Sequence, residues 1–353
     1  MIIIITLTGC KRDINDATDS YNEIQPDNVR ILEIITLIDL SDEIDFIYNV
    51  SIIDDILYLP AAIINDNDPP FNTTKLFTYN INSKNFTELY NYSNNVTIPD
   101  DADGGFLSLL YAMKAGDGNI WVAEYGHFYK YEIPENLNKE DIDDNDIWLY
   151  RNMIHNDFLF RKLDNTGNEL LSVDHNNLSN SFDHDFFYSF NVDLDDNIYL
   201  SFSDIVYVFD TAGNMLFNVE VSINHQVIRL SDGSVAVFNI RDRTGKRLRI
   251  IDTRTRSLGN YISLPEETEI IYPGSGDFIA FISDGTSIIG IDHETGKPVQ
   301  LIDLAANNFI SNGILNVASL PDNKFLLISW VGDEDGNNFK LEMIILSLVP
   351  QPH

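Results

Sequence analysis

The chain is poor in positive charge and has a single cysteine. Its 353 residues hold 22 lysines and arginines against 55 aspartates and glutamates, so the formal net charge is −33 at pH 7. Nucleic acids and anionic membrane surfaces are usually bound through a cationic face, and this balance argues against both as partners. Because Cys10 is alone, neither an intrachain disulfide nor a thiolate zinc site is open to the folded body.

Several motifs of nucleotide and metal chemistry are also missing. The sequence has no glycine loop of the G-x-x-x-x-G-K-[ST] type, no G-x-G-x-x-G that opens a helix, and no H-E-x-x-H. No apolar stretch approaches the roughly 18 uninterrupted residues that cross a bilayer. The chain contains 21 phenylalanines and 16 tyrosines, which are enough to supply a core. We therefore expect a folded protein that does not use nucleotides.

The first ten residues combine a short apolar run, at 2–7, with the sole cysteine. Leu7-Thr8-Gly9-Cys10 resembles a bacterial lipobox, in which small residues admit the signal peptidase and the cysteine becomes lipidated. The resemblance implies a lipid anchor on Cys10, a bacterial cell-surface location outside the cytoplasmic membrane, and an acidic spacer at 11–29. The apolar run is shorter than a usual signal core and no lysine or arginine precedes it. Two other interpretations therefore stay open: a true start upstream, or an ordinary N-terminal strand with a chance cysteine.

Alternation of apolar and polar residues dominates the chain and predicts an all-β fold. A turn followed by a buried strand recurs, most clearly in Asp117-Gly118-Asn119-Ile120-Trp121-Val122-Ala123. Further copies begin at Asp195, Asp232 and Asp322, with weaker ones at Asp54 and Ser275. Asp-Gly and Asp-Asn pairs tolerate the positive φ that a tight turn requires.

A second turn signature lies between these copies. It begins at Asn80, Asp164, Asp210, Asp252 and Asp292, and the last four are spaced by 46, 42 and 40 residues. A four-stranded meander of about 40 to 50 residues is the unit of a β-propeller. The two interleaved signatures predict a β-propeller over 30–349 with six four-stranded blades, with seven left open, and 350–353 as a tail.

Two irregularities in the repeat carry further predictions. The interval from Asp117 to Asp195 is too long for one blade, and its excess lies near 134–156, which we interpret as an insertion in the second blade. The last unit has no room for a fourth strand, whereas residues 30–38 form a spare one. Pairing this N-terminal strand into the last blade would close the ring and leave no ragged edge there.

The unit from Asp117 to Ala123 resembles the degenerate repeats of streptogramin-lyase-like and two-component-sensor propellers. That resemblance implies the architecture and no activity. The lipobox, acidic spacer and Pro-rich end also resemble the N-terminal half of certain bacterial surface lipoproteins that continue into an extracellular solute-binding domain. On that likeness, 349–353 is either a truncated linker or a natural terminus.

Aromatic residues are concentrated in the second blade and its insertion, where they are candidates for ligand binding. The candidates are Trp121, Tyr125, Tyr129, Trp148 and Tyr150. Such rings serve sugar and peptide binders as stacking platforms, but aromatic residues are also typical of packing between propeller sheets. Recognition is usually placed on loops of a rigid ring, so a functional surface is expected near this insertion.

Two sets of polar residues are candidates for binding a metal. His175 with Asp183, His184 and Asp185 could supply imidazole and carboxylate ligands, although a histidine beside an aspartate is more often part of a solvated turn. Acidic loops at 66–68, 100–103, 141–146 and 333–337 suit weak structural Ca²⁺ but lack the EF-hand spacing. Turn chemistry and solubilising charge explain these loops equally well. We expect no other cofactor.

No catalytic constellation emerges from the sequence, which favours a non-enzymatic function. The preferred hypothesis is a lipid-anchored surface protein whose propeller binds an extracellular protein, peptide or glycan, as an accessory to solute capture. A metal-assisted propeller hydrolase or lyase that uses His175 and His184 is one alternative. A scaffold that organises other envelope proteins is another.

Overall fold

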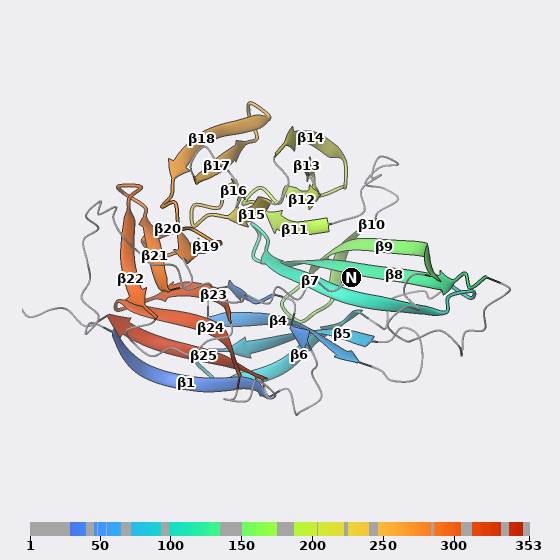
Figure 1. Ribbon diagram of the computed structural model, residues 1–353, viewed down its shortest axis with the longest axis horizontal. Coiled ribbons are helices and arrows are strands. Elements are labelled where there is room, and N and C mark those ends of the chain that lie inside the picture. Colours follow the sequence, from blue (N-terminus) through green and yellow to red (C-terminus); the bar gives the residue numbers. More distant parts are fainter. Residues whose placement is uncertain are drawn as a thin grey trace, which may run out of the picture.

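The protein is built from antiparallel strands arranged as six sheets around a common axis (Figure 1). The computed structural model describes residues 29–39, 46–47, 49–53, 55–64, 72–92, 99–134, 150–174, 187–202, 204–221, 225–239, 246–283, 286–304, 313–332 and 339–348. In these ranges there are 25 strands and no helix. The fold is therefore a six-bladed β-propeller, which confirms the architecture that the repeat predicts.

The blades follow the chain in order, and each is an antiparallel meander. Blade 1 consists of β2 (Phe46–Ile47), β3 (Ser51–Ile53), β4 (Ile56–Ile64), β5 (Asn72–Asn80) and β6 (Asn85–Asn91). Blade 2 consists of β7 (Gly104–Lys114), β8 (Ile120–Tyr131), β9 (Arg151–Leu163) and β10 (Glu169–Asp174). Blade 3 consists of β11 (Phe187–Val192), β12 (Ile198–Phe202), β13 (Ile205–Phe209) and β14 (Met215–Glu220).

The second half of the ring repeats the plan. Blade 4 consists of β15 (His225–Arg229), β16 (Val235–Asn239), β17 (Arg247–Asp252) and β18 (Ser257–Ser263). Blade 5 consists of β19 (Ile270–Ser275), β20 (Phe278–Ser283), β21 (Ser287–Asp292) and β22 (Pro298–Asp303). Blade 6 consists of β23 (Gly313–Leu320), β24 (Lys324–Gly332), β25 (Phe339–Leu348) and β1 (Val29–Asp39).

The first strand of each blade lies innermost. These strands contact one another in a closed circle, in the order β3, β7, β11, β15, β19, β23 and back to β3. In blade 1 the inner strand is split, since β2 and β3 both pair with β4, at Phe46↔Ala62 and Ser51↔Tyr58. The circle is complete with six members, so no seventh blade is inserted in it.

The ring is closed by its N-terminal strand, as predicted. β1 pairs antiparallel with β25 from Val29↔Leu348 to Asp39↔Lys340 and supplies the outer strand of blade 6. The first and last described strands of the chain therefore lie in one sheet. Breaking that sheet would expose the edge of β25.

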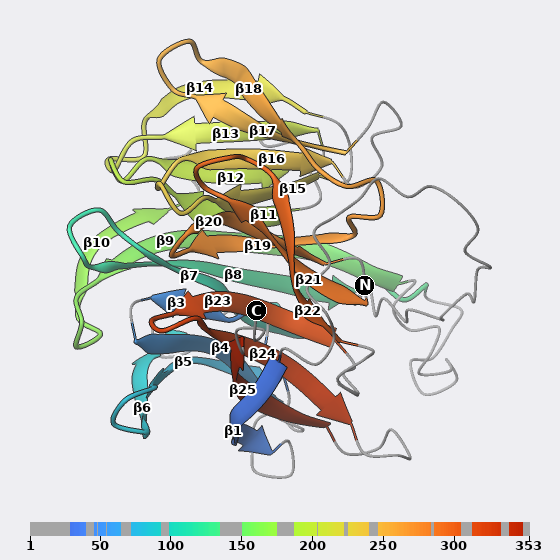
Figure 2. The same cartoon turned by 90° about the vertical axis from the view of Figure 1, so that its left-hand side faces the viewer.

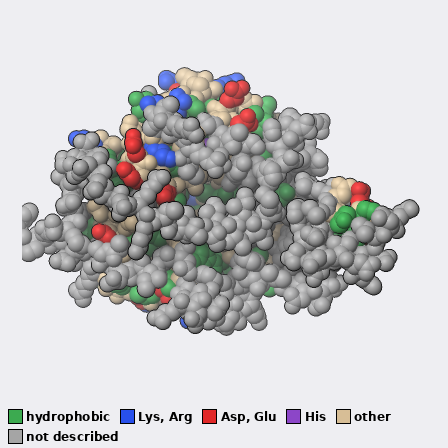
Figure 3. All heavy atoms as spheres, in the orientation of Figure 1, with side chains coloured by type: hydrophobic (Ala, Val, Ile, Leu, Met, Phe, Trp, Pro, Cys, Tyr) green, Lys and Arg blue, Asp and Glu red, His purple; other side chains and the backbone are tan. Residues whose placement is uncertain are grey.

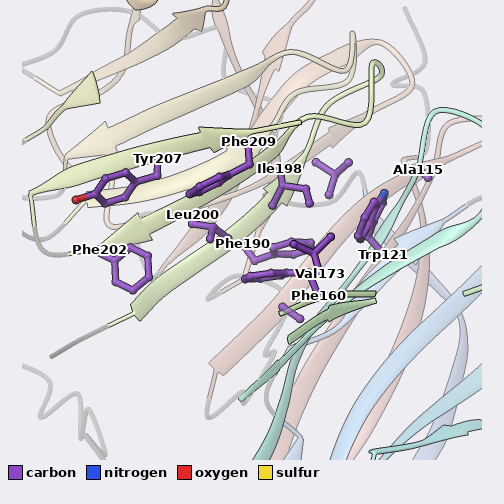
Figure 4. Close-up of a cluster of buried hydrophobic side chains, with 12 residues drawn as sticks. Ala115, Trp121, Phe160, Val173, Phe190, Ile198, Leu200, Phe202, Tyr207 and Phe209 are labelled. Atoms are coloured by element: carbon purple, nitrogen blue, oxygen red, sulfur yellow. The ribbon is translucent and has the colours of Figure 1, made fainter. Parts of the chain in front are cut away.

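In the described ranges the core is divided into six apolar clusters, one for each contact between neighbouring blades. Successive side chains of a strand point to opposite faces of its sheet. In β24, for example, Leu326 and Ile328 pack toward blade 1 whereas Phe325 and Leu327 pack toward blade 5. Figure 4 shows the cluster between blades 2 and 3, where Phe160 and Phe190 stack with ring centroids 5.3 Å apart.

Both turn signatures lie at the same end of the ring, which we call the turn face. In a meander, the turn from strand one to two and the turn from strand three to four share one end of the sheet, and Figure 2 shows these turns along one side. The positive φ that the sequence predicts is present at Gly118, Asp196 and Gly233 in the first series, and at Gly167 and Gly213 in the second. The opposite end of the ring, where the other connections begin and end, is the loop face.

Candidate functional site

Blade 2 projects beyond its neighbours at the loop face. Its first three strands contain 11, 12 and 13 residues, whereas the strands of blades 3 to 5 contain five to seven. Since β8 leaves the turn face at Ile120, the additional residues lie at the far end of the blade (Figure 1). We call residues 125–134 and 150–158 the blade 2 arm. Of the predicted insertion at 134–156, residues 151–156 belong to β9, and residues 135–149 lie outside the described residues.

The two ends of the insertion are held together by hydrogen bonds. The Glu132 amide donates to the Tyr150 carbonyl at 2.9 Å, and Asn152 Nδ2 donates to Glu132 Oε1 at 2.8 Å. The Tyr131 amide donates to Asp103 Oδ2 at 2.8 Å, which ties the arm to the chain that enters β7. The described strand ends of the arm are therefore fixed to each other and to the start of β7.

The five aromatic candidates divide between the core and the arm. Trp121 is fully buried in the cluster between blades 2 and 3, and Tyr129 is 2% exposed (Figure 4 shows Trp121). Tyr125 and Tyr150 are half-buried on the arm. Tyr125 also packs against the cluster that holds Trp121, and burial raises its pKa. Trp148 lies outside the described residues. Only Tyr125 and Tyr150 therefore combine the predicted type of side chain with exposed surface in the described part of the chain.

A further aromatic residue of the arm, Tyr131, was not among the predicted ligand contacts. It is half-buried, and its ring meets that of Tyr129 edge to face with centroids 5.3 Å apart. Tyr125, Tyr129 and Tyr131 occupy alternate positions of β8, yet Tyr129 is buried, so alternation alone did not distinguish Tyr131 as an exposed residue.

The four residues predicted to bind a metal lie in one segment that the structure does not describe. His175, Asp183, His184 and Asp185 lie outside the described residues, between the end of β10 and the start of β11. Of the acidic loops, only 100–103 is described, and there Asp101 lies 3.6 Å from Lys130 while Asp103 accepts the Tyr131 amide. Within the described ranges, no group of three or more His, Cys, Asp or Glu side chains is arranged to hold a metal ion.

A buried charge cluster lies between blades 1 and 2. Glu124 is fully buried, Arg161 Nε donates to its Oε2 at 2.8 Å, and Arg161 also pairs with Glu169. Burial raises the pKa of Glu124 to about 7, although the Arg161 guanidinium and the Tyr90 hydroxyl both favour the charged form. The sequence contained one signal that Glu124 is buried, because Glu124 directly follows the apolar run at 120–123 of β8.

A second cluster of charged side chains joins blades 2 and 3 at the turn face. Lys162 Nζ lies 2.8 Å from Asp117 Oδ2 and 2.7 Å from Asp196 Oδ2, and 5.8 Å from the centre of the Trp121 ring. The hydrogen bond from Lys162 lowers the pKa of Asp117. Asp117 and Asp196 come from the first turns of two blades, so the turn signature also joins neighbouring blades.

A serine and a histidine meet between blades 3 and 4. Ser201 Oγ and His225 Nε2 lie 2.6 Å apart, with exposed fractions of 0% and 3%. Such a pair can activate a nucleophile where substrate reaches the hydroxyl. Here both side chains are buried, so the hydrogen bond connects β12 with β15 inside the ring.

No protein-family model matches the sequence, and no curated protein matches it. Solved structures with a similar fold include the intramolecular trans-sialidase from Ruminococcus gnavus in complex with oseltamivir carboxylate, at a TM-score of 0.47 and 10% identity over 90% of this chain and 98% of that chain. The Pan2 WD40 domain from Neurospora crassa has a TM-score of 0.44 and 8% identity over 94% of this chain and 98% of that chain. At these identities, the activities and ligands of those proteins cannot be assigned to this chain. No helix in the described ranges is long and apolar enough to cross a membrane.

Proposed function

We propose that this propeller is a non-enzymatic binding protein, held on the bacterial cell surface by a lipid on Cys10, and that its ligand is an extracellular protein, peptide or glycan. The blade 2 arm is the single observation that carries this proposal. It extends past the ring at the loop face, presents Tyr125, Tyr131 and Tyr150 half-buried, and carries the longest connection between two strands of one blade. Loops and rims on a rigid scaffold are where recognition is commonly placed.

Packing of the turn face supports the choice of the loop face. A side chain added at Gly116 would overlap the Leu194 carbonyl, and one added at Gly233 would overlap the Leu194 side chain. The first turns of blades 2, 3 and 4 therefore lie directly against one another. A surface built of such close contacts has little freedom to present new side chains to a ligand.

The use of the buried titratable groups supports binding over catalysis. Glu124 is paired with Arg161, Lys162 is shared by two aspartates, and His225 bonds to Ser201 inside the ring. Each of these groups joins strands or blades. A general acid or base must instead reach the proton that it transfers in a bound substrate.

The proposal is tested by screening the full chain on glycan and peptide arrays, and then repeating the screen with Tyr125→Ser, Tyr131→Ser and Tyr150→Ser combined. Met215→Ser with Leu216→Ser is the matched control, because these side chains are exposed on the outer strand of blade 3. We expect a glycan or peptide ligand whose affinity falls at least about tenfold in the arm variant, which is about 1.4 kcal/mol, and stays unchanged in the control. Absence of any ligand on both arrays would exclude a peptide or glycan ligand, and equal loss in both variants or catalytic turnover of a bound ligand would overturn the proposal.

A further inference from the structure

Positive charge is concentrated in one short part of this acidic chain. Seven of its 22 lysines and arginines lie within residues 241–256, together with two acidic residues, Asp242 and Asp252. The described positive side chains of this segment are Lys246, Arg247, Arg249, Arg254 and Arg256, which we call the blade 4 basic row. Arg241 and Arg243 lie outside the described residues.

The basic row follows the third strand of blade 4. Lys246 and Arg247 stand at the loop-face end of β17, Arg249 lies along the strand, and Arg254 and Arg256 lie in the turn to β18. Arg249, Arg254 and Arg256 are exposed, whereas Lys246 and Arg247 are half-buried. Blue side chains gather at the top of Figure 3, over the β17 and β18 of Figure 1.

The row makes little use of its charge inside the protein. Arg254 has a carboxylate near it, Asp252 at 3.9 Å, yet the Arg254 side chain is 89% exposed. Arg247, Arg249 and Arg256 form no ion pair with any residue in the described ranges. Most of the positive charge therefore faces solvent.

Protection of a sheet edge does not explain these arginines. Charged residues are often placed on an edge strand to prevent pairing with another chain. β17 is not an edge strand, because it pairs with β16 on one side and with β18 on the other. The true edge strand, β18, has the sequence Ser-Leu-Gly-Asn-Tyr-Ile-Ser and carries no charge.

An exposed aromatic ring lies within the row. Tyr261 is 53% exposed and pairs across the strands with Arg249, while the Arg247 guanidinium lies 4.7 Å from the centre of its ring. Guanidinium groups bind carboxylate and sulfate oxygens in a two-pronged geometry, and an aromatic ring offers an apolar surface with a polar tip. Anion-binding groups beside an aromatic ring suit a sugar that carries acidic substituents.

We propose that the blade 4 basic row binds an acidic polysaccharide, a sugar polymer with carboxylate or sulfate groups. The row is one strand wide, and β17 from Arg247 to Asp252 spans roughly 17 Å at about 3.3 Å per residue. A thin polymer can follow it while the remaining negative charge is screened beyond about 8 Å at physiological ionic strength. A DNA duplex is broader and more densely charged, so it would also meet the surrounding acidic surface.

This inference goes beyond the ligand proposed for the loop face and does not depend on it. The blade 2 arm and the blade 4 basic row belong to different blades, so variants of one leave the other intact. Loss of a ligand in the arm variant alone, or in the row variant alone, identifies which surface binds it.

The test measures binding of the full chain to heparin, which is sulfated, to polygalacturonate, which is carboxylated, and to neutral dextran, a DNA duplex and poly-glutamate. The variant is Arg247→Gln with Arg249→Gln. The control is Lys297→Gln with Lys324→Gln, which removes the same charge from exposed or half-buried positions on other blades. Thermal unfolding of each protein checks that the fold is retained.

We expect heparin, polygalacturonate or both to bind, with an affinity that decreases as salt increases. In the arginine variant the affinity falls at least about tenfold, and in the lysine control less than about twofold. Tyr261→Ser weakens binding to the polysaccharide without changing the net charge. No binding to either polysaccharide, equal losses in the two double variants, or tighter binding of DNA or poly-glutamate than of both polysaccharides would overturn the proposal.

Discussion

Arg161 Nε lies 2.8 Å from Glu124 Oε2 in the seam between blades 1 and 2, and the Glu124 side chain is fully buried. The pair joins β8 to β9 on the face that also carries Val122 and Leu163 of the apolar cluster between blades 1 and 2. Removing water from two charges is costly, and the contact between the two side chains offsets that cost only while both charges are present.

Loss of Arg161 should destabilise the propeller strongly. Arg161→Ala leaves Glu124 buried without its cation, and we expect a loss of about 3 to 5 kcal/mol in the free energy of unfolding. Arg161→Met combined with Glu124→Leu removes both charges and should restore most of that loss. Denaturant unfolding of the three proteins measures the difference. A double variant as unstable as Arg161→Ala would contradict this account.

Glu124 should also make stability depend on pH. Its pKa is about 7 in the folded protein and 4.5 as the ordinary value, so between these pH values the folded state binds more protons than the unfolded state. Its contribution to stability is therefore fully present below pH 4.5 and is lost as the pH rises through 7. The wild type should therefore lose unfolding free energy relative to Glu124→Gln as the pH rises from 5 to 8. A difference that stays constant over this range would contradict the shifted pKa.

The architecture could be predicted from the sequence because its signals are local. Each first turn pairs an aspartate or serine with a residue that tolerates positive φ, and each such turn is followed by a buried strand. Asp196, Gly233 and Asn323 take the predicted backbone conformation. Closure by the N-terminal strand followed from counting strands, since the last unit lacked one.

The candidate site could be predicted only in part, for physical reasons. A propeller blade is covered on both faces, so apolar alternation does not tell which aromatic residues are exposed, and Trp121 and Tyr129 proved to be buried. The contact between Glu124 and Arg161 depends on a register that spans the insertion. Net charge averages over the whole chain and therefore concealed the basic row of blade 4.

Two glycines of one turn should respond differently to substitution. A Cβ at Gly116 would overlap the Leu194 carbonyl, so Gly116→Ala should cost about 1 to 3 kcal/mol of stability. Gly118 has a φ of 89° but open space around it, and Asp196 occupies the corresponding position in blade 3 with a φ of 62°. Since asparagine tolerates this conformation, Gly118→Asn should stay within about 0.5 kcal/mol of the wild type. Thermal unfolding of both variants decides; equal losses would refute close packing of the turn face.

Lipidation of Cys10 is the prediction on which the proposed location depends. In a bacterial host, metabolic labelling with a fatty acid and intact-mass analysis should detect acylation of the wild type and none of Cys10→Ala. Ser20→Ala, within the acidic spacer, is a control that should remain acylated. If the wild-type cysteine is unmodified, surface display by a lipid anchor is wrong, while the binding surfaces argued from the propeller are unaffected.

Closure by β1 should decide whether the ring stays monomeric. β1 contributes Ile35 and Leu37 to the cluster between blades 6 and 1, and its Glu33 pairs with Lys84 of blade 1. A chain that begins at residue 29 keeps all of these contacts and should remain folded and monomeric. A chain that begins at residue 40 exposes the ten-residue edge of β25, where unpaired backbone groups can recruit a strand from another molecule. Size-exclusion chromatography and limited proteolysis should therefore detect aggregation or rapid cleavage for the shorter chain only. Should both chains be equally stable and monomeric, β1 would be dispensable and the ring would be held by the contacts among its inner strands.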